Sequence, residues 1–289
     1  MKIIKYSVLA FILSIALQIC NGCANVKIDR FTRSDKQLKR YYKKANINAE
    51  LAYFKVGENT IRAMRIGDTT LPNFLMLHGS PGSSMDYDSY IEDTTLTNHY
   101  CLLICDRPGY GYSNWGKVDT SVLHQSKVIL KALSPWLKDK QFAVLGNSFG
   151  GPIAATVAAL SKGKANHLVL VASSIAPGEE RIYGISKTII KPSWKWLFPT
   201  MAYLPSAEKL THEKALQTIA PIISTYSGSI LMLHGTADNL VYYSNTDYAK
   251  KIFTKAKKLT IADFPGEGHP ILWNNKERVK KLILTFMKY

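Results

Sequence analysis

The sequence predicts an α/β protein with a mostly parallel, doubly wound sheet and an inserted, mainly helical cap. From Leu51 onwards, short apolar runs typical of strands alternate with longer amphipathic runs typical of helices. This alternation favours a parallel sheet that has helices on both faces. It lapses in residues 173–228, which contain five prolines and several large aromatic residues. That segment is expected to form the cap, and its prolines predict that the cap has no long uninterrupted helix.

The expected elements follow in order from apolar runs bounded by turn residues. A hairpin is predicted where two alternating runs, 51–56 and 61–66, flank a Gly-Glu-Asn turn. The remaining strands are predicted at 73–77, 100–105, 142–145, 167–172, 229–233 and 259–263, and helices at 87–91, 121–137, 153–160, 242–253 and 275–287. The core is therefore predicted over 49–172 and 229–289, and the cap over 173–228.

The first residues have the pattern of an export signal. Lys2 and Lys5 precede an apolar run over 8–19, and small or polar residues follow. The run is shorter than the about 20 residues that a membrane-spanning helix needs. We expect residues 1–22 to be a signal peptide. The residues before Cys23 resemble a bacterial lipoprotein signal, with the small Gly22 directly before the cysteine. That resemblance implies lipidation of Cys23 in an exported bacterial protein, membrane-anchored and facing the periplasm or the cell surface. An ordinary signal peptide and an uncleaved anchor are the alternatives.

Residues 23–48 are polar and basic, and we expect them to form a tether. Leu38, Tyr41 and Tyr42 recur at helical spacing among lysines, which predicts a short basic amphipathic helix. The tether either is solvated or faces the membrane. The net charge of +16 is spread along the whole chain, and no RNA-binding or helix-turn-helix signature accompanies it. Nucleic acid is therefore not an expected partner.

A glycine-rich turn carries the first chemical signal. An apolar run delivers Ser148 into the sequence Gly-Asn-Ser-Phe-Gly-Gly, residues 146–151, and a helix-forming run leaves it. A sharp strand-to-helix turn needs small flanking residues, and the N–H groups of the helix favour negative charge beside the serine. The pattern and its context are typical of a nucleophile elbow. The alternative is a glycine-rich turn that contains a serine by chance.

Other polar residues are expected at the carboxyl ends of strands, where the loops of a parallel sheet gather functional groups. These include Ser80, Asp238 and His269. A serine becomes a nucleophile when a base accepts its proton, and the base works best when a carboxylate orients it. Ser148, Asp238 and His269 follow one another in the chain order of one particular serine-hydrolase scaffold. Asp238 could instead cap the helix that follows it.

Residues 51–289 resemble the α/β-hydrolase superfamily. The motifs that carry the resemblance are His-Gly-Ser-Pro-Gly at 78–82, the loop at 106–113, the elbow at 146–151, His-Gly-Thr-Ala-Asp at 234–238 and Gly-Glu-Gly-His at 266–269. The resemblance implies a capped sheet of the α/β-hydrolase type, with Ser148 as nucleophile, His269 as general base and then acid, and Asp238 as the carboxylate that orients it.

It also implies an oxyanion hole. One donor would be the backbone N–H of Phe149. The other would come from the loop after His78, where Pro81 has no N–H and Ser80 is the expected donor. In relatives the loop that holds Asp106 and Arg107 shapes the floor of the site, so these two residues are expected to be structural. No metal-ligand spacing and no dinucleotide-binding glycine motif is visible, so neither a metal nor a cofactor is expected.

The sequence therefore predicts a serine hydrolase that acts by acyl transfer, and the substrate is expected to be a small carboxylic ester with an apolar or aromatic group. A carbon–carbon bond hydrolase is an alternative, although such relatives place tryptophan after the catalytic histidine and this chain has Pro270. An aminopeptidase is another, although Phe149 stands where those relatives have tryptophan. A non-catalytic surface lipoprotein is the third. The oligomeric state stays open.

Overall fold

The computed structural model describes residues 28, 32–92, 94–138 and 140–287. The expected signal peptide and the expected lipidation site, Cys23, lie outside these residues. Within the described part of the chain, no helix combines the length and the apolar character that crossing a membrane requires.

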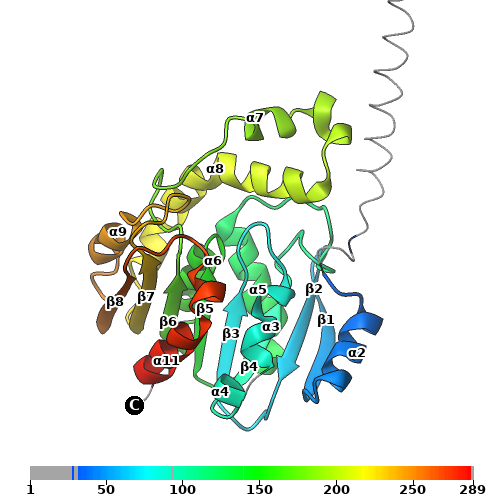
Figure 1. Ribbon diagram of the computed structural model, residues 1–289, viewed down its shortest axis with the longest axis vertical. Helices are drawn as coiled ribbons and strands as arrows, with labels where there is room; N and C mark the ends of the chain where they lie inside the picture. The colour runs from blue at the N-terminus through cyan, green and yellow to red at the C-terminus, as the bar shows by residue number, and fades with distance from the viewer. Residues whose placement is uncertain (1–27, 29–31, 93, 139, 288–289) are drawn as a thin grey trace, which may run out of the picture.

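The centre of the molecule is an eight-stranded sheet (Figure 1). Its strands, in chain order, are β1 (Ala49–Val56), β2 (Asn59–Ile66), β3 (Asn73–Leu77), β4 (Cys101–Cys105), β5 (Phe142–Asn147), β6 (Ala165–Val171), β7 (Ser229–Gly235) and β8 (Lys258–Phe264). Their order across the sheet is β1-β2-β4-β3-β5-β6-β7-β8. The first two pairings are antiparallel and the other five are parallel. The predicted α/β fold with a mostly parallel sheet is confirmed.

The strand register brings the carboxyl ends of the parallel strands level with one another. Leu77, the last residue of β3, pairs with Gly146 of β5. Val171, the last residue of β6, pairs with Asn147 of β5 on one side and with Leu233 of β7 on the other. The loops that follow β3, β5, β6 and β7 therefore leave the same edge of the sheet, where side chains from distant parts of the sequence can meet.

Helices cover both faces of the sheet and enclose two hydrophobic cores. One core lies against α5 (Val122–Leu137), α6 (Gly150–Leu160) and α9 (Asn245–Ile252). The opposite core lies against α3 (Asp88–Ile91), α4 (Thr94–Thr97), α10 (Ile271–Asn274) and α11 (Lys276–Met287), with the 3-10 helix η2 (Ser84–Tyr87) preceding α3. The inner strands β3, β4, β5, β6 and β7 are mostly buried and apolar because helices cover both faces of the sheet there.

The cap lies between β6 and β7 and crosses the carboxyl edge of the sheet (Figure 1). It contains α7 (Ser186–Ile189), the 3-10 helix η3 (Pro192–Leu197) and α8 (Thr200–Ile223). The expectation of no long cap helix is wrong, because α8 has 24 residues and includes Pro205 and Pro221. These prolines lie toward the two ends of α8. Between them, buried side chains recur every three or four residues, so burial of one face outweighs the lost backbone hydrogen bonds.

The described part of the expected tether differs from a solvated linker. It forms the predicted helix, α2 (Asp35–Lys44), which begins with a capping box at Ser34. The helix buries Leu38 and Tyr42 in the core that α3 and α11 also cover, and just before it Arg33 forms an ion pair with Asp88. The apolar face of α2 is thus covered by the protein itself, and the helix belongs to the folded core.

Candidate active site

The candidate nucleophile lies on a tight turn between β5 and α6. Ser148 has a backbone φ of +52°, in the left-handed region that residues other than glycine seldom adopt. The flanking glycines allow the close packing of this turn. A Cβ at Gly146 would lie 2.2 Å from the carbonyl oxygen of Gly150, and one at Gly150 would lie 2.3 Å from that of Leu77. Backbone atoms cannot move aside cheaply, so these positions require glycine, as the elbow pattern predicts.

Three residues from distant parts of the chain meet at this turn. Asp238 follows β7 and His269 follows β8. Nε2 of His269 lies 3.0 Å from Oγ of Ser148, and Nδ1 lies 2.7 Å from Oδ2 of Asp238. The structure therefore joins all three sequence-predicted side chains in one hydrogen-bonded chain, in the order that proton transfer from a serine requires.

The surroundings of Asp238 hold it as a carboxylate. Burial alone would raise the pKa of Asp238, but the hydrogen bond from His269 and those from the amides of Leu240 and Val241 outweigh it and lower that pKa. The two amides lie 2.9 Å from Oδ1, which leaves Oδ2 for the imidazole. An ionised Asp238 accepts the Nδ1–H of His269, so Nε2 is free to accept the proton of Ser148.

The loop after β3 lies against the candidate nucleophile. A Cβ placed on Gly79 would come 3.1 Å from the Cβ of Ser148. The expected oxyanion donors are the amides of Ser80, in this loop, and Phe149, which directly precedes α6. Neither amide donates a hydrogen bond to any residue that the structure describes. Both are therefore available to an acceptor that enters the site.

The other two histidines at strand ends have structural contacts. His78 is buried, accepts a hydrogen bond from the amide of Arg107 through Nε2, and contacts the carbonyl of Gly79 through Nδ1. Burial, together with the positive charge of Arg107, lowers the pKa of His78 well below its usual value. Nε2 of His234 contacts the carbonyl of Val241. His78 thus holds the loop that contains Arg107, and His234 holds the loop that contains Val241.

Arg107 links this site to the cap through a residue that the sequence reasoning missed, Glu208. The guanidinium of Arg107 is fully buried and lies 2.9 Å from Oε1 of Glu208 in α8. The same carboxylate accepts a 2.6 Å hydrogen bond from the hydroxyl of Tyr110, which lies 2.8 Å from Oγ of Ser80. Arg107 also donates to the carbonyl of Gly79. The cap and the loop that holds Ser80 are thus fastened together, and Arg107 has the structural role expected of it.

A second serine–histidine contact lies close to the elbow and was also missed. Nε2 of His212, in α8, lies 3.1 Å from Oγ of Ser174, and its ring packs on that of Phe149 with centroids 4.5 Å apart. Both Ser174 and His212 are buried. Burial lowers the pKa of His212, more than the nearby Glu180 raises it. Ser148 has His269 and Asp238 in line, whereas Nδ1 of His212 has no hydrogen-bond partner among the described residues.

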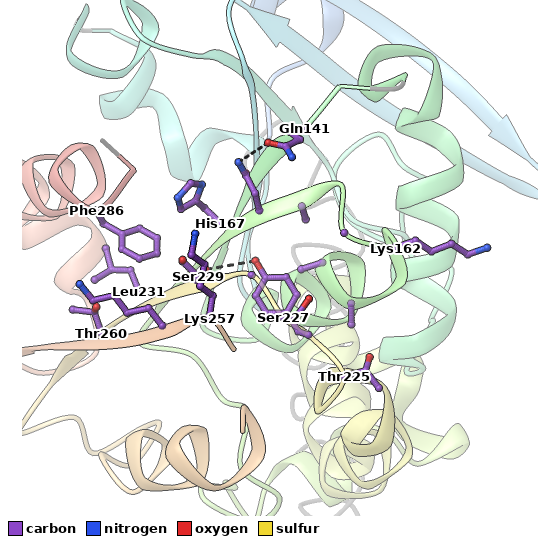
Figure 2. Close-up of a pocket in the computed structure, with 18 of the residues that line it drawn as sticks. Gln141, Lys162, His167, Thr225, Ser227, Ser229, Leu231, Lys257, Thr260 and Phe286 are labelled. Atoms are coloured by element: carbon purple, nitrogen blue, oxygen red, sulfur yellow. Dashed lines mark hydrogen bonds between the residues drawn. The ribbon is translucent and has the colours of Figure 1, made fainter. Parts of the chain in front are cut away.

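A large groove lies at the opposite edge of the sheet. Figure 2 shows it at the start of β6, β7 and β8, with Lys162, His167, Ser229, Lys257 and Phe286 among the labelled residues. Its volume is about 1040 Å³. None of the three hydrogen-bonded residues lines it, so the groove is separate from the candidate active site. Within the described residues, no group of three or more His, Cys, Asp or Glu side chains is arranged to hold a metal ion.

Comparisons with known proteins agree with this architecture. The family model for the alpha/beta hydrolase fold matches residues 72–203. Esterase FrsA of Escherichia coli O1:K1 is 35% identical over 98 residues, which cover 32% of this chain. The match spans only 23% of the esterase, less than a quarter of its length.

Solved structures share the fold over most of the chain. A membrane phospholipase A, described as a bacterial virulence factor, has a TM-score of 0.64 at 18% identity, covering 98% of each chain. The 2-hydroxy-6-oxo-6-phenylhexa-2,4-dienoate hydrolase of Rhodococcus sp. strain RHA1 has a TM-score of 0.65 at 14% identity, covering 84% of this chain and all of its own. The chain therefore has the α/β-hydrolase fold. The family model supports the α/β-hydrolase superfamily over residues 72–203.

Proposed function

We propose that this protein is a serine hydrolase that cleaves carboxylic esters through an acyl-enzyme on Ser148. The observation that carries the proposal is the contact of His269 with Ser148 at 3.0 Å and with Asp238 at 2.7 Å. Proton removal needs a base within about 2.6–3.2 Å of the hydroxyl and a third group that orients that base. Both conditions hold at the carboxyl edge of the sheet, beneath the cap.

In the first step His269 accepts the proton of Ser148 while Oγ attacks the ester carbonyl carbon. The carbonyl oxygen becomes an oxyanion, which accepts hydrogen bonds from the amides of Phe149 and Ser80. The bond between the carbonyl carbon and the alkoxy oxygen then breaks. The alcohol leaves with the proton from His269, and the acyl group stays on Ser148. Asp238 stabilises the imidazolium that exists between these proton transfers.

In the second step water attacks the acyl-enzyme. His269 takes a proton from the water, the same two amides stabilise the second oxyanion, and the bond to Oγ breaks. The carboxylic acid is released and His269 returns the proton to Ser148. An ester is favoured because the match to an esterase supports it. Carbon–carbon bond hydrolases have tryptophan where this chain has Pro270, and the aminopeptidases that cleave an amide have tryptophan where it has Phe149.

We further propose that the chain is exported and anchored to a membrane through lipidated Cys23, since the residues before it have the pattern of a lipoprotein signal. Metabolic labelling with an alkyne analogue of palmitate tests this. The label should be present in the native chain and absent in Cys23→Ser. Equal labelling of both would contradict the anchor.

Turnover of p-nitrophenyl esters from acetate to palmitate tests the reaction. Native protein should hydrolyse part of this series, and Ser148→Ala should lose about 10⁶-fold in kcat. Ser174→Ala is the matched control, because Ser174 also contacts a histidine, and it should keep most of the activity. Undiminished turnover in Ser148→Ala, or loss in Ser174→Ala alone, would overturn the assignment.

A further inference from the structure

The cap carries five exposed apolar side chains within fifteen residues. These are Ile182, Tyr183, Ile185, Trp194 and Trp196, and we call them the cap patch. Their exposed fractions run from 45% for Trp194 to 66% for Trp196. Single exposed apolar residues are ordinary, but a concentration of this kind marks an interaction surface.

The exposure follows from how the cap is built. The short helix α7 buries Ser186 and Ile189 and packs against α8. In Figure 1 α7 lies on the outer side of α8, away from the sheet. Ser186 and Ile189 are thus already used in packing, while the side chains of the cap patch are exposed to solvent.

The charges around the cap patch indicate which partner. Residues 181–199 contain four basic and no acidic residues. Arg181, Lys187 and Lys191 are exposed, and the guanidinium of Arg181 lies 5.1 Å from the centre of the Tyr183 ring. Tryptophan and tyrosine mixed with lysine and arginine are typical of groups that lie at a membrane–water interface. An anionic leaflet attracts each nearby basic residue, whereas the same surface of a second copy would repel it.

We infer that the cap patch docks on the anionic surface of a lipid bilayer, and that the ester substrate is an amphiphilic lipid taken from that surface. The docking stands on the exposed residues and their charge. The substrate part rests on the function proposed for Ser148. The geometry suits this use, because the cap patch lies on the same cap that covers the carboxyl edge of the sheet.

Fluorescence quenching by lipids with brominated acyl chains tests the docking in the full-length chain. Vesicles of phosphatidylglycerol and brominated phosphatidylcholine should quench native protein, because Trp194 and Trp196 would enter the bilayer. Quenching should be lost in Trp194→Phe/Trp196→Phe, which keeps the aromatic surface but removes the two fluorophores. It should persist in Trp273→Phe, the matched control, because Trp273 is 41% exposed outside the cap patch. This readout does not depend on the N-terminal segment, which contains no tryptophan.

Charge reversal supplies an independent test. Lys187→Glu/Lys191→Glu should reduce quenching by phosphatidylglycerol vesicles, whereas Lys257→Glu/Lys258→Glu, in the groove at the other edge of the sheet, should not. Two outcomes would overturn the docking. One is equal quenching of native protein and Trp194→Phe/Trp196→Phe. The other is a native dimer, seen by analytical ultracentrifugation, that becomes a monomer in Trp194→Ser/Trp196→Ser, because the cap patch would then bind a second copy.

Kinetics test the substrate. A lipid ester should be hydrolysed faster when it is carried in phosphatidylglycerol vesicles than when it is dissolved as monomers. Trp194→Ser/Trp196→Ser should hydrolyse the vesicle-borne ester about tenfold more slowly than native protein, while its rate on p-nitrophenyl acetate stays unchanged. Equal loss on both substrates would refute the lipid substrate. If the proposed reaction itself is wrong, neither ester is hydrolysed, yet quenching of Ser148→Ala by brominated vesicles still reports the docking.

Discussion

Replacing Glu208 with alanine should destabilise the protein far more than loss of a surface ion pair would. The carboxylate is 2% exposed and its partner Arg107 is fully buried. Glu208 accepts hydrogen bonds from Arg107 at 2.9 and 3.3 Å, from Tyr110 at 2.6 Å and from Gln125 at 3.1 Å. In Glu208→Ala, Tyr110 keeps its contact with Ser80, and Gln125 keeps the carbonyl of Asp119. The guanidinium of Arg107, in contrast, loses the carboxylate that balances its charge.

Leaving a buried charge without its partner costs about 3–5 kcal/mol. We expect urea unfolding at pH 7, followed by circular dichroism at 222 nm, to show a loss of that size in the unfolding free energy of Glu208→Ala. Arg107→Met/Glu208→Met removes both charges and should recover most of the loss. A loss below about 1 kcal/mol, the range of an exposed ion pair, would refute the reasoning, because it would mean that water reaches Arg107.

Three further predictions concern the site and its supports. Asp238→Asn should lower kcat on p-nitrophenyl esters about 10⁴-fold with little change in KM, since the histidine loses its orienting carboxylate; activity within tenfold of native would contradict this. Gly150→Ala should lose about 1–3 kcal/mol of unfolding free energy, because the new Cβ meets the carbonyl of Leu77. Gly184→Ala, whose Cβ meets nothing within 4 Å, should change it by less than about 0.5 kcal/mol, and equal losses would argue against the packing account. Burial raises the pKa of Asp86 to about 7, above the about 3.9 of an unfolded chain. Between these two pKa values the folded state binds a proton on Asp86 that the unfolded state does not. Native protein should therefore lose stability relative to Asp86→Asn as pH rises from 5 to 8. Urea midpoints of the two proteins that change in parallel with pH would contradict the raised pKa of Asp86.

Local pattern was enough to predict most of the elements that build the site. The strand at 73–77 was predicted with the bounds it has, since a short apolar run between turn residues allows few alternatives. The elbow was predicted from Gly146 and Gly150, whose Cβ positions are blocked by backbone. The meeting of Ser148 with His269 followed from parallel strands that end at one edge, which the register shows.

What sequence reasoning missed depends on tertiary contacts. The sequence around Glu208 does not show that it pairs with Arg107, 101 positions away. A buried arginine needs an acidic partner, but the sequence does not identify which residue that is. Pro205 and Pro221 predicted that α8 would be interrupted, because each proline acts on its own helical turn. The burial that outweighs this cost depends on packing against α5 and α6, which are distant in the sequence. The helical spacing of Leu38 and Tyr42 predicted α2, but spacing alone does not say which surface covers its apolar face.

Identification of the serine that a fluorophosphonate modifies tests whether Ser148 is the nucleophile. Native full-length protein is treated with the probe, digested, and mapped by mass spectrometry. One phosphonate is expected, on Ser148, with no labelling of Ser148→Ala and undiminished labelling of Ser174→Ala. A phosphonate on Ser174 or on another serine, or a native chain that the probe does not modify, would contradict that assignment.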